Sequence, residues 1–112
     1  MIARVWHGVS AASRSDRFHE YMTRTGVKDC RETVGNRGVL VLKRTEEDRV
    51  HFLFVSLWES YDAIKRFAGD DIGKAVYYPE DESFLLELEP AVTHYDVFAN
   101  LPSGGVGDDF PL

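Results

Sequence analysis

The stretch Arg49–Ser60 has hardly a polar residue between its ends. β-Branched and aromatic residues dominate it, and it is too short for a buried helix, so the pattern predicts a β-strand. Both faces of this strand are largely apolar. One face carries His51, Leu53, Val55 and Leu57, and the other carries Phe52, Phe54, Ser56 and Trp58. A strand of this kind has to be covered on both sides.

Three further segments have the composition of strands, namely Ile2–Val9, Val39–Arg44 and Ala91–Phe98. The four polar residues at 45–48 have the length of a hairpin loop, so we expect the second and third strands to be antiparallel neighbours. A turn cluster with two glycines, at 35–38, precedes the second strand.

Two segments show the three- and four-residue apolar spacing of amphipathic helices. The first starts at the N-cap candidates Ser13 or Ser15, and we expect Gly26 to end it before a shorter helical piece over Val27–Glu32. The second follows the N-cap candidate Ser60. Its apolar face consists of Ile64, Phe67 and Ala68.

The segment between the second helix and the last strand is the least regular. Asp70 or Asp71 would cap a short helix that runs to Val76, and Pro79 then forces an extended step at the residue before it. Glu80–Glu89 is interpreted as an irregular or briefly helical connector, whose leading acidic residues are a solvated charge run.

The resulting order is strand, helix, strand, strand, helix, strand. It predicts an α+β fold of the ferredoxin-like type, with a four-stranded antiparallel sheet and both helices on one face. We assign residues 1–99 to this domain and residues 100–112 to a flexible tail, because the tail is rich in glycine and proline and has little apolar surface. The uncovered sheet face predicts a homodimer that packs sheet against sheet, with a partner of different sequence as the alternative.

Composition narrows the class of protein. The 112 residues suffice for one domain, and the net charge of −6 argues against nucleic-acid binding through phosphates. Cys30 is the only cysteine, which excludes an intramolecular disulfide and fits a reducing cytosol. No apolar run approaches the roughly 20 residues that span a bilayer. We therefore expect a cytoplasmic protein that binds neither nucleic acid nor membrane.

Four segments together resemble one known family: MIARVWHG at the N-terminus, VSLWES at the end of the third strand, GKAVYYPED, and LEPAVTHYDVF near the last strand. They cover Ile2–Phe98 and are similar to the antibiotic-biosynthesis-monooxygenase-like group of the dimeric α/β-barrel superfamily. The resemblance implies a pocket between sheet and helices, lined by the tryptophan that ends the third strand, here Trp58.

The same resemblance bears on chemistry. The family includes cofactor-free oxygenases of polyketide-type aromatics, haem-degrading enzymes, and quinone- or signal-modifying enzymes. Tyr77 stands where the haem-degrading members have a histidine, and His7 stands near the place of their asparagine, which disfavours haem degradation. Phe54 replaces an asparagine of the polyketide oxygenases.

Several side chains are candidates for a site. His7 and Trp58 are expected at the same end of neighbouring strands, where His7 would be a base toward an acidic phenol or enol, with Trp58 as the wall. The alternative is that Trp58 is a core residue and His7 a rim group. Tyr77 would donate a hydrogen bond, and Tyr78 would line the mouth, or both tyrosines pack the connector.

Arginine and histidine side chains are candidates for binding an anion and a metal ion, respectively. Arg37, like Arg4, would bind an anionic substrate or balance the many carboxylates. His7, His51 and His94 all lie on expected strands, but with the first and third strands taken as parallel, His7 and His51 would be about 10–15 Å apart. The sequence therefore predicts no metal site, and without a phosphate-binding glycine loop or a flavin or nicotinamide fingerprint it predicts no bound cofactor.

We expect either a cofactor-independent monooxygenase of an electron-rich aromatic or quinol, or a non-catalytic ligand-binding or stress-associated dimer with the same cleft. A pocket faced by both His7 and Trp58 would favour the enzyme. A cleft filled by Phe18, Phe54 and Phe67 would disfavour it.

Overall fold

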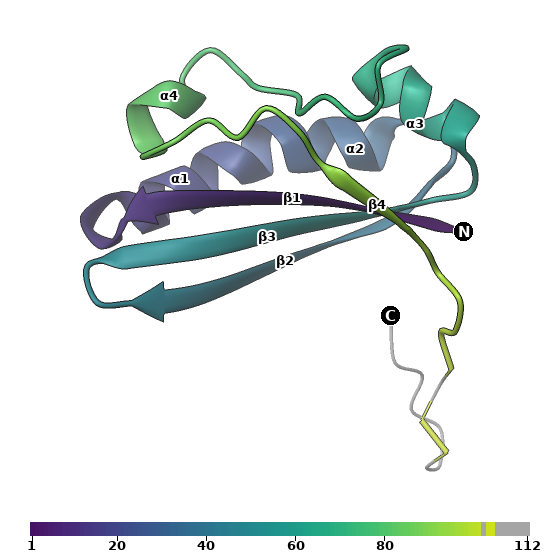
Figure 1. Cartoon of the computed structure of the whole chain (residues 1–112), viewed down its shortest axis with the longest axis horizontal. Coiled ribbons are helices and arrows are strands. Elements are labelled where there is room, and N and C mark those ends of the chain that lie inside the picture. Colours follow the sequence, from purple (N-terminus) through teal and green to yellow (C-terminus); the bar gives the residue numbers. More distant parts are fainter. Residues whose placement is uncertain (102, 105–112) are drawn as a thin grey trace.

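A computed structural model describes residues 1–101, 103 and 104. Its four-stranded sheet, shown in Figure 1, has the order β2-β3-β1-β4, and each pair of neighbouring strands is antiparallel. The strands are β1 (Ile2–Ala11), β2 (Asn36–Glu46), β3 (Arg49–Trp58) and β4 (Thr93–Asp96). The α+β class and the antiparallel four-stranded sheet are thus confirmed, although the last strand is shorter than predicted.

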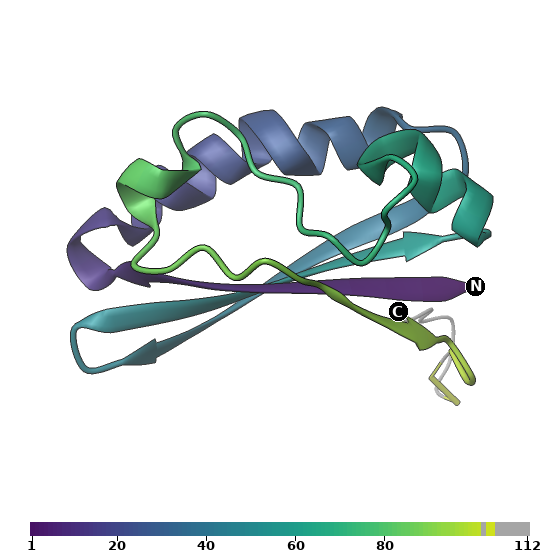
Figure 2. The ribbon, with the colours of Figure 1, turned by 45° about the horizontal axis from the view of Figure 1, so that its top comes forward.

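The helical segments all lie on one face of the sheet (Figures 1 and 2). After β1 come the 3-10 turn η1 (Ala12–Arg14), α1 (Ser15–Met22), the π-helical η2 (Thr23–Val27) and α2 (Lys28–Glu32), which follow one another without a break. The expected break at Gly26 is wrong, because this buried glycine lies against the ring of Phe54 and the chain passes it as a π-helical turn.

The second half of the helical layer contains α3 (Tyr61–Ala68) and the single turn α4 (Asp81–Phe84). Ser60 caps α3 as predicted, since its hydroxyl accepts from the Ala63 N–H at 3.1 Å. The short helix predicted to end at Val76 is absent from the described residues. Lys74 instead forms an isolated β-bridge with Ala91, so this segment is extended.

The alignment of β1 with β3 decides which side chains share a face. Ile2 lies opposite Trp58, and Val9 lies opposite His51. The expected parallel arrangement is wrong, because the helical crossover gives β1 and β2 the same direction and the hairpin then reverses β3. Even-numbered residues of both strands therefore face the helices, and odd-numbered residues face away.

The core consists of two clusters of buried side chains under the helices. One surrounds Trp58 and Ile64, and the other surrounds Phe18 and Phe52. Phe54 packs against both clusters. This arrangement leaves the junction of the two clusters, over the middle of β1 and β3, as the place where a cavity forms.

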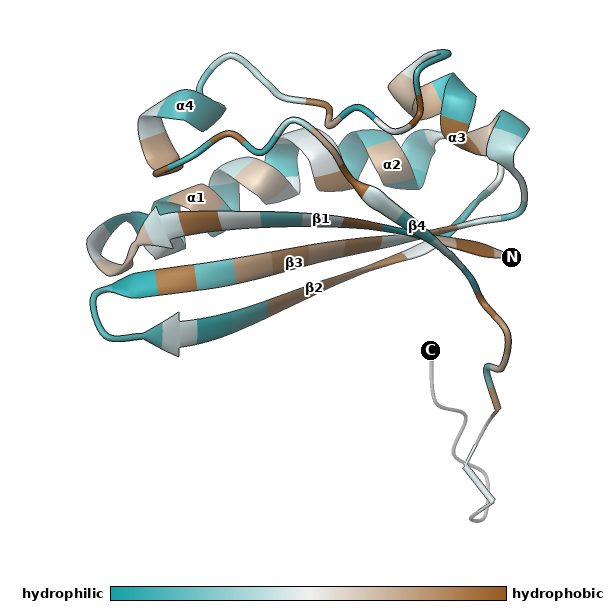
Figure 3. Cartoon of the chain, viewed as in Figure 1, coloured by the Kyte–Doolittle hydropathy of each residue, from teal (hydrophilic) through white to brown (hydrophobic). Residues whose placement is uncertain are grey.

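The opposite sheet face has no helix over it in the described chain. Leu42 and Leu53 lie opposite each other on β2 and β3 and are 45% and 37% exposed. Figure 3 shows apolar stretches along the three long strands. We call this surface, which carries Val5, His7, Leu42, Leu53 and Val55, the open face. None of the helices in the described part of the chain combines the length and the apolar character that a membrane crossing requires.

We predict that Gly8→Ala destabilises the protein by about 1–3 kcal/mol, the usual cost of overpacking. A Cβ at this position would lie 2.1 Å from the indole ring of Trp6, which covers Gly8 on the helical side. Urea unfolding measures the effect. Gly73→Ala is the control, because the nearest atom to its added Cβ is 3.9 Å away. Equal stability of the two variants would contradict the packing of Trp6 on β1.

Candidate functional site

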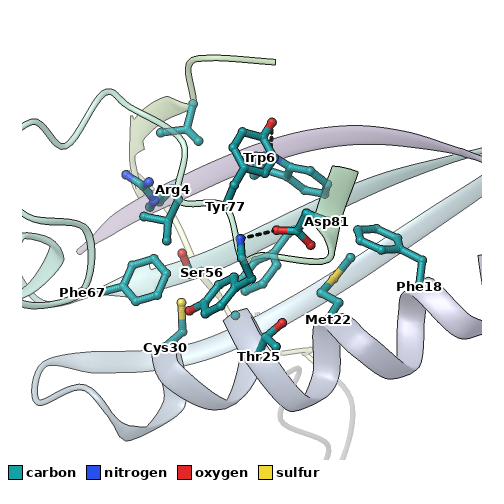
Figure 4. Close-up of a pocket in the computed structure, with 15 residues that line it drawn as sticks. Arg4, Trp6, Phe18, Met22, Thr25, Cys30, Ser56, Phe67, Tyr77 and Asp81 are labelled. Carbon is teal, nitrogen blue, oxygen red and sulfur yellow. Dashed lines mark hydrogen bonds between the residues drawn. The ribbon is translucent and has the colours of Figure 1, made fainter. Parts of the chain in front are cut away.

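A cavity lies between the sheet and the helices (Figure 4). The centre of a water-sized sphere can occupy about 50 Å³ of it, and the empty space including the mouth that opens to solvent is about 520 Å³. Its walls come from β1, β3, the continuous segment of α1, η2 and α2, from α3, and from α4 with the residues before it. They include Arg4, Trp6, Phe18, Met22, Thr25, Cys30, Phe54, Ser56, Phe67, Tyr77, Tyr78 and Asp81.

Asp81 places a buried carboxyl group in this cavity. The residue is 7% exposed, and its Oδ2 accepts the Tyr78 N–H at 2.6 Å. Burial raises the pKa of Asp81, and the hydrogen bond from Tyr78 opposes this only in part. A carboxyl group with a raised pKa in an apolar cleft is suited to take and return a proton.

The interpretation of Asp81 as part of a solvated charge run is wrong, because this residue is buried. Its neighbours Glu80 and Glu82 are indeed exposed, but α4 is a single turn, and Leu85 after it is anchored in the core. That anchor turns Asp81 inward. No signal in the sequence distinguishes it from the acidic residues on either side.

The two tyrosines before Pro79 both line the cavity, but their hydroxyl protons are already engaged. The Tyr77 hydroxyl donates to the Glu89 carbonyl at 2.6 Å and accepts from Trp6 Nε1 at 3.2 Å. The Tyr78 hydroxyl donates to Asp29 Oδ2 at 2.5 Å. Burial raises the pKa of both. They therefore form neutral walls, and in this arrangement the donor predicted at Tyr77 is used within the protein.

Arg4 and Cys30 mark the other side of the cavity. Arg4 is 4% exposed, and it donates to the carbonyls of Ile72 and Lys74. Cys30 is buried, and burial raises the pKa of its thiol to about 12 despite the positive charge of Arg4. Cys30 is therefore a neutral thiol near neutral pH.

His7 lies on the open face, away from the cavity. Its Nδ1 is 2.5 Å from Glu89 Oε2, and its Nε2 is 3.1 Å from Nδ1 of His51. The predicted separation of 10–15 Å between these histidines is wrong, because antiparallel strands bring Val9 opposite His51, and thus His7 diagonally beside it. His94 lies on the other face, beside Arg4. In the described part of the chain, no three His, Cys, Asp or Glu side chains converge as a metal-binding group.

Trp58 does not line the cavity. It is fully buried, its indole N–H donates to Ser56 Oγ at 2.8 Å, and it stacks on Phe67. The prediction that His7 and Trp58 lie at the same end of neighbouring strands is wrong, since Trp58 pairs with Ile2 and His7 pairs with Leu53. The two side chains also lie on opposite faces of the sheet. Trp6 supplies the indole wall instead. Its even number on β1 would have indicated this once the register was known.

The remaining predicted residues divide between the cavity and the surface. Phe54 and Tyr78 line the cavity. Arg37 is exposed and pairs with Glu59 at 2.7 Å, outside the cavity. The structure thus brings together four candidates, Arg4, Phe54, Tyr77 and Tyr78, and it adds Trp6 and Asp81.

Comparison with known proteins adds no assignment: no family model matches this chain, and no curated protein matches it. The similarity to the monooxygenase-like group therefore rests on the four sequence segments quoted above.

We predict that Asp81→Asn makes the protein more stable than the wild type at pH 7. The folded-state pKa of Asp81 lies above its unfolded value, so the wild type loses stability as pH rises through the interval between the two values. Asparagine does not ionise, and its oxygen can still accept from Tyr78. Urea unfolding at pH 4 and pH 7 measures this, and the advantage of Asp81→Asn should shrink at pH 4.

The matched control is Glu82→Gln, one position away and exposed. It should show a small difference at both pH values. A variant Asp81→Asn that loses stability as pH rises, relative to the wild type, would contradict a raised pKa for Asp81.

Proposed function

We propose that the protein binds a small electron-rich aromatic phenol or quinol in this cavity and promotes its oxidation by dioxygen. The observation that carries the proposal is Asp81, a buried carboxyl group with a raised pKa among aromatic walls. The resemblance to the monooxygenase-like group supports the same class of reaction. Membership of that group is part of this proposal.

The chemistry requires one proton acceptor and a shielded cavity. Asp81 takes the proton of the bound phenol or enol, and the resulting anion is electron-rich enough to give an electron to dioxygen. In a monooxygenation of a quinol, one oxygen atom enters a ring C–H bond as a hydroxyl group, and the other leaves as water with the two hydrogens that the quinol hydroxyls lose as the ring becomes a quinone. The substrate supplies all four electrons, so the atoms and electrons balance.

The walls of the cavity serve this reaction in two ways. Trp6, Phe54 and Tyr78 present aromatic surfaces on which a planar ring can pack. The apolar surroundings exclude water, which strengthens electrostatic interactions of the substrate anion and protects reactive intermediates.

A second candidate function is ligand binding without catalysis. It is favoured by the narrow interior of the cavity, where the centre of a water-sized sphere can occupy only about 50 Å³ and which Phe18, Phe54 and Phe67 all line. It is also favoured by the two tyrosine hydroxyls, whose protons are engaged by Glu89 and Asp29. Both functions use the same cavity and differ only in whether the bound ring reacts.

The proposal includes a homodimer through the open face. Leu42 and Leu53 lie side by side there and remain substantially exposed. A second copy is the occupant we favour, because two-fold pairing of identical faces is the commonest way to bury such a surface and the family resemblance implies it.

We expect purified protein to accelerate oxygen uptake by 1,4-naphthohydroquinone above the uncatalysed rate. Asp81→Asn should lower the added rate about 100-fold or more, the usual contribution of a general base. Glu82→Gln is the matched control and should keep it. His7→Ala should also keep the rate, since His7 is on the far side of the sheet. Equal rates for Asp81→Asn and Glu82→Gln would remove Asp81 as the base.

We expect light scattering after gel filtration to give twice the chain mass of 12.7 kDa. Leu53→Glu puts a charge in the middle of the open face and should yield monomers. Val34→Glu, at a 75% exposed position between α2 and β2, should remain dimeric. A wild type that is monomeric at micromolar concentration would contradict the dimer.

A further inference from the structure

Arg4 is a buried cation without an acidic partner in the described chain. It is 4% exposed, and no Asp or Glu oxygen of the described residues forms an ion pair with it. Its guanidinium contacts the carbonyls of Ile72 and Lys74 and the Nε2 atom of His94 at 3.3 Å. A buried charge is usually paired, because leaving water is costly.

The groups around Arg4 are all neutral or act as hydrogen-bond acceptors without a full charge. Burial, together with the charge of Arg4, lowers the pKa of His94, so its Nε2 accepts from the guanidinium. Cys30 keeps its proton, as shown above. The Phe67 ring lies 5.9 Å from Cζ of Arg4 and offers its π face. None of these contacts neutralises the positive charge.

The guanidinium has five N–H donors, and the contacts above use three of them. Arg4 also lines the cavity (Figure 4), and the two N–H groups left over have no hydrogen-bond partner among the described residues. Asp81 lines the same cavity but forms no ion pair with Arg4 among the described residues. The cavity is thus bounded by a cation at one place and a proton acceptor at another.

A purely structural role for Arg4 is to hold the segment at 72–74 against β1 through the two carbonyls. That role explains the hydrogen bonds. It does not require a full charge next to a cavity, since a neutral donor would hold a carbonyl with a smaller desolvation cost.

We propose that the ligand of this cavity is an aromatic carboxylate and that Arg4 binds its carboxylate group. This inference rests on the proposed function and names the substrate class: a ring that carries a carboxylate for Arg4 and a phenolic or enolic proton for Asp81. A carboxylate supplies the missing negative charge, and its two oxygens can accept a bidentate pair of hydrogen bonds from the planar guanidinium. Arg4 is then the specificity-determining residue, and neutral rings are poorer ligands.

Isothermal titration of the full chain at pH 7 with benzoate and benzamide tests this, because the two probes share shape and differ in charge. The wild type should bind benzoate at least about tenfold more tightly than benzamide, the effect of one charge-assisted contact. Arg4→Gln should abolish that preference, because benzoate binding should weaken at least about tenfold and benzamide binding should change less. Arg37→Gln, a surface arginine on the same sheet, is the matched control and should keep the preference.

The outcomes separate this inference from the proposed function. Equal affinity of the wild type for both probes overturns the role of Arg4 while leaving an aromatic-binding cavity in place. Binding of neither probe overturns both. Because the wild-type comparison requires no variant at position 4, the test holds even if Arg4→Gln fails to fold. In that case Arg4→Lys, which keeps the charge, should retain the preference for benzoate.

Discussion

The antiparallel pairing of β1 with β3 is the constraint on which the rest of the structure depends. With Ile2 opposite Trp58, the side chains of Arg4, Trp6, Phe54 and Ser56 all lie under the helices, and the odd-numbered residues of both strands lie on the open face. A shift by one residue would exchange the two sets, since side chains alternate along a strand. The cavity and the open face are therefore two consequences of one register.

The covered face holds two charged residue types that a core usually avoids. Burial raises the pKa of Asp81, and among the described residues the Arg4 guanidinium contacts carbonyl groups, an imidazole and an aromatic ring but no carboxylate. Both arrangements cost stability, and both lie at the same cavity, between the two clusters of buried side chains. Groups whose environments disfavour their charged forms concentrate at functional sites, which is why we base the function on this cavity.

The open face has its own polar network at one end. Glu89, His7 and His51 form a chain of contacts, and Nε2 of His51 is buried without a hydrogen-bond partner, at 3.7 Å from Glu46. The leucines beside this network are exposed. The face thus combines apolar surface with polar groups that are incompletely satisfied, which is typical of a surface that meets a partner.

The sequence determined the elements of this protein, because the alternation around Phe52 and Phe54 and the helical spacing after Ser60 are local patterns that need no knowledge of the fold. It also indicated that one sheet face would lack a cover. Only the tertiary structure decided which residues meet. His7 and Trp58 lie on opposite faces of the sheet, and Asp81 faces the cavity although its two sequence neighbours, Glu80 and Glu82, are exposed. Strand direction and burial depend on contacts distant in sequence, so no local pattern contains them.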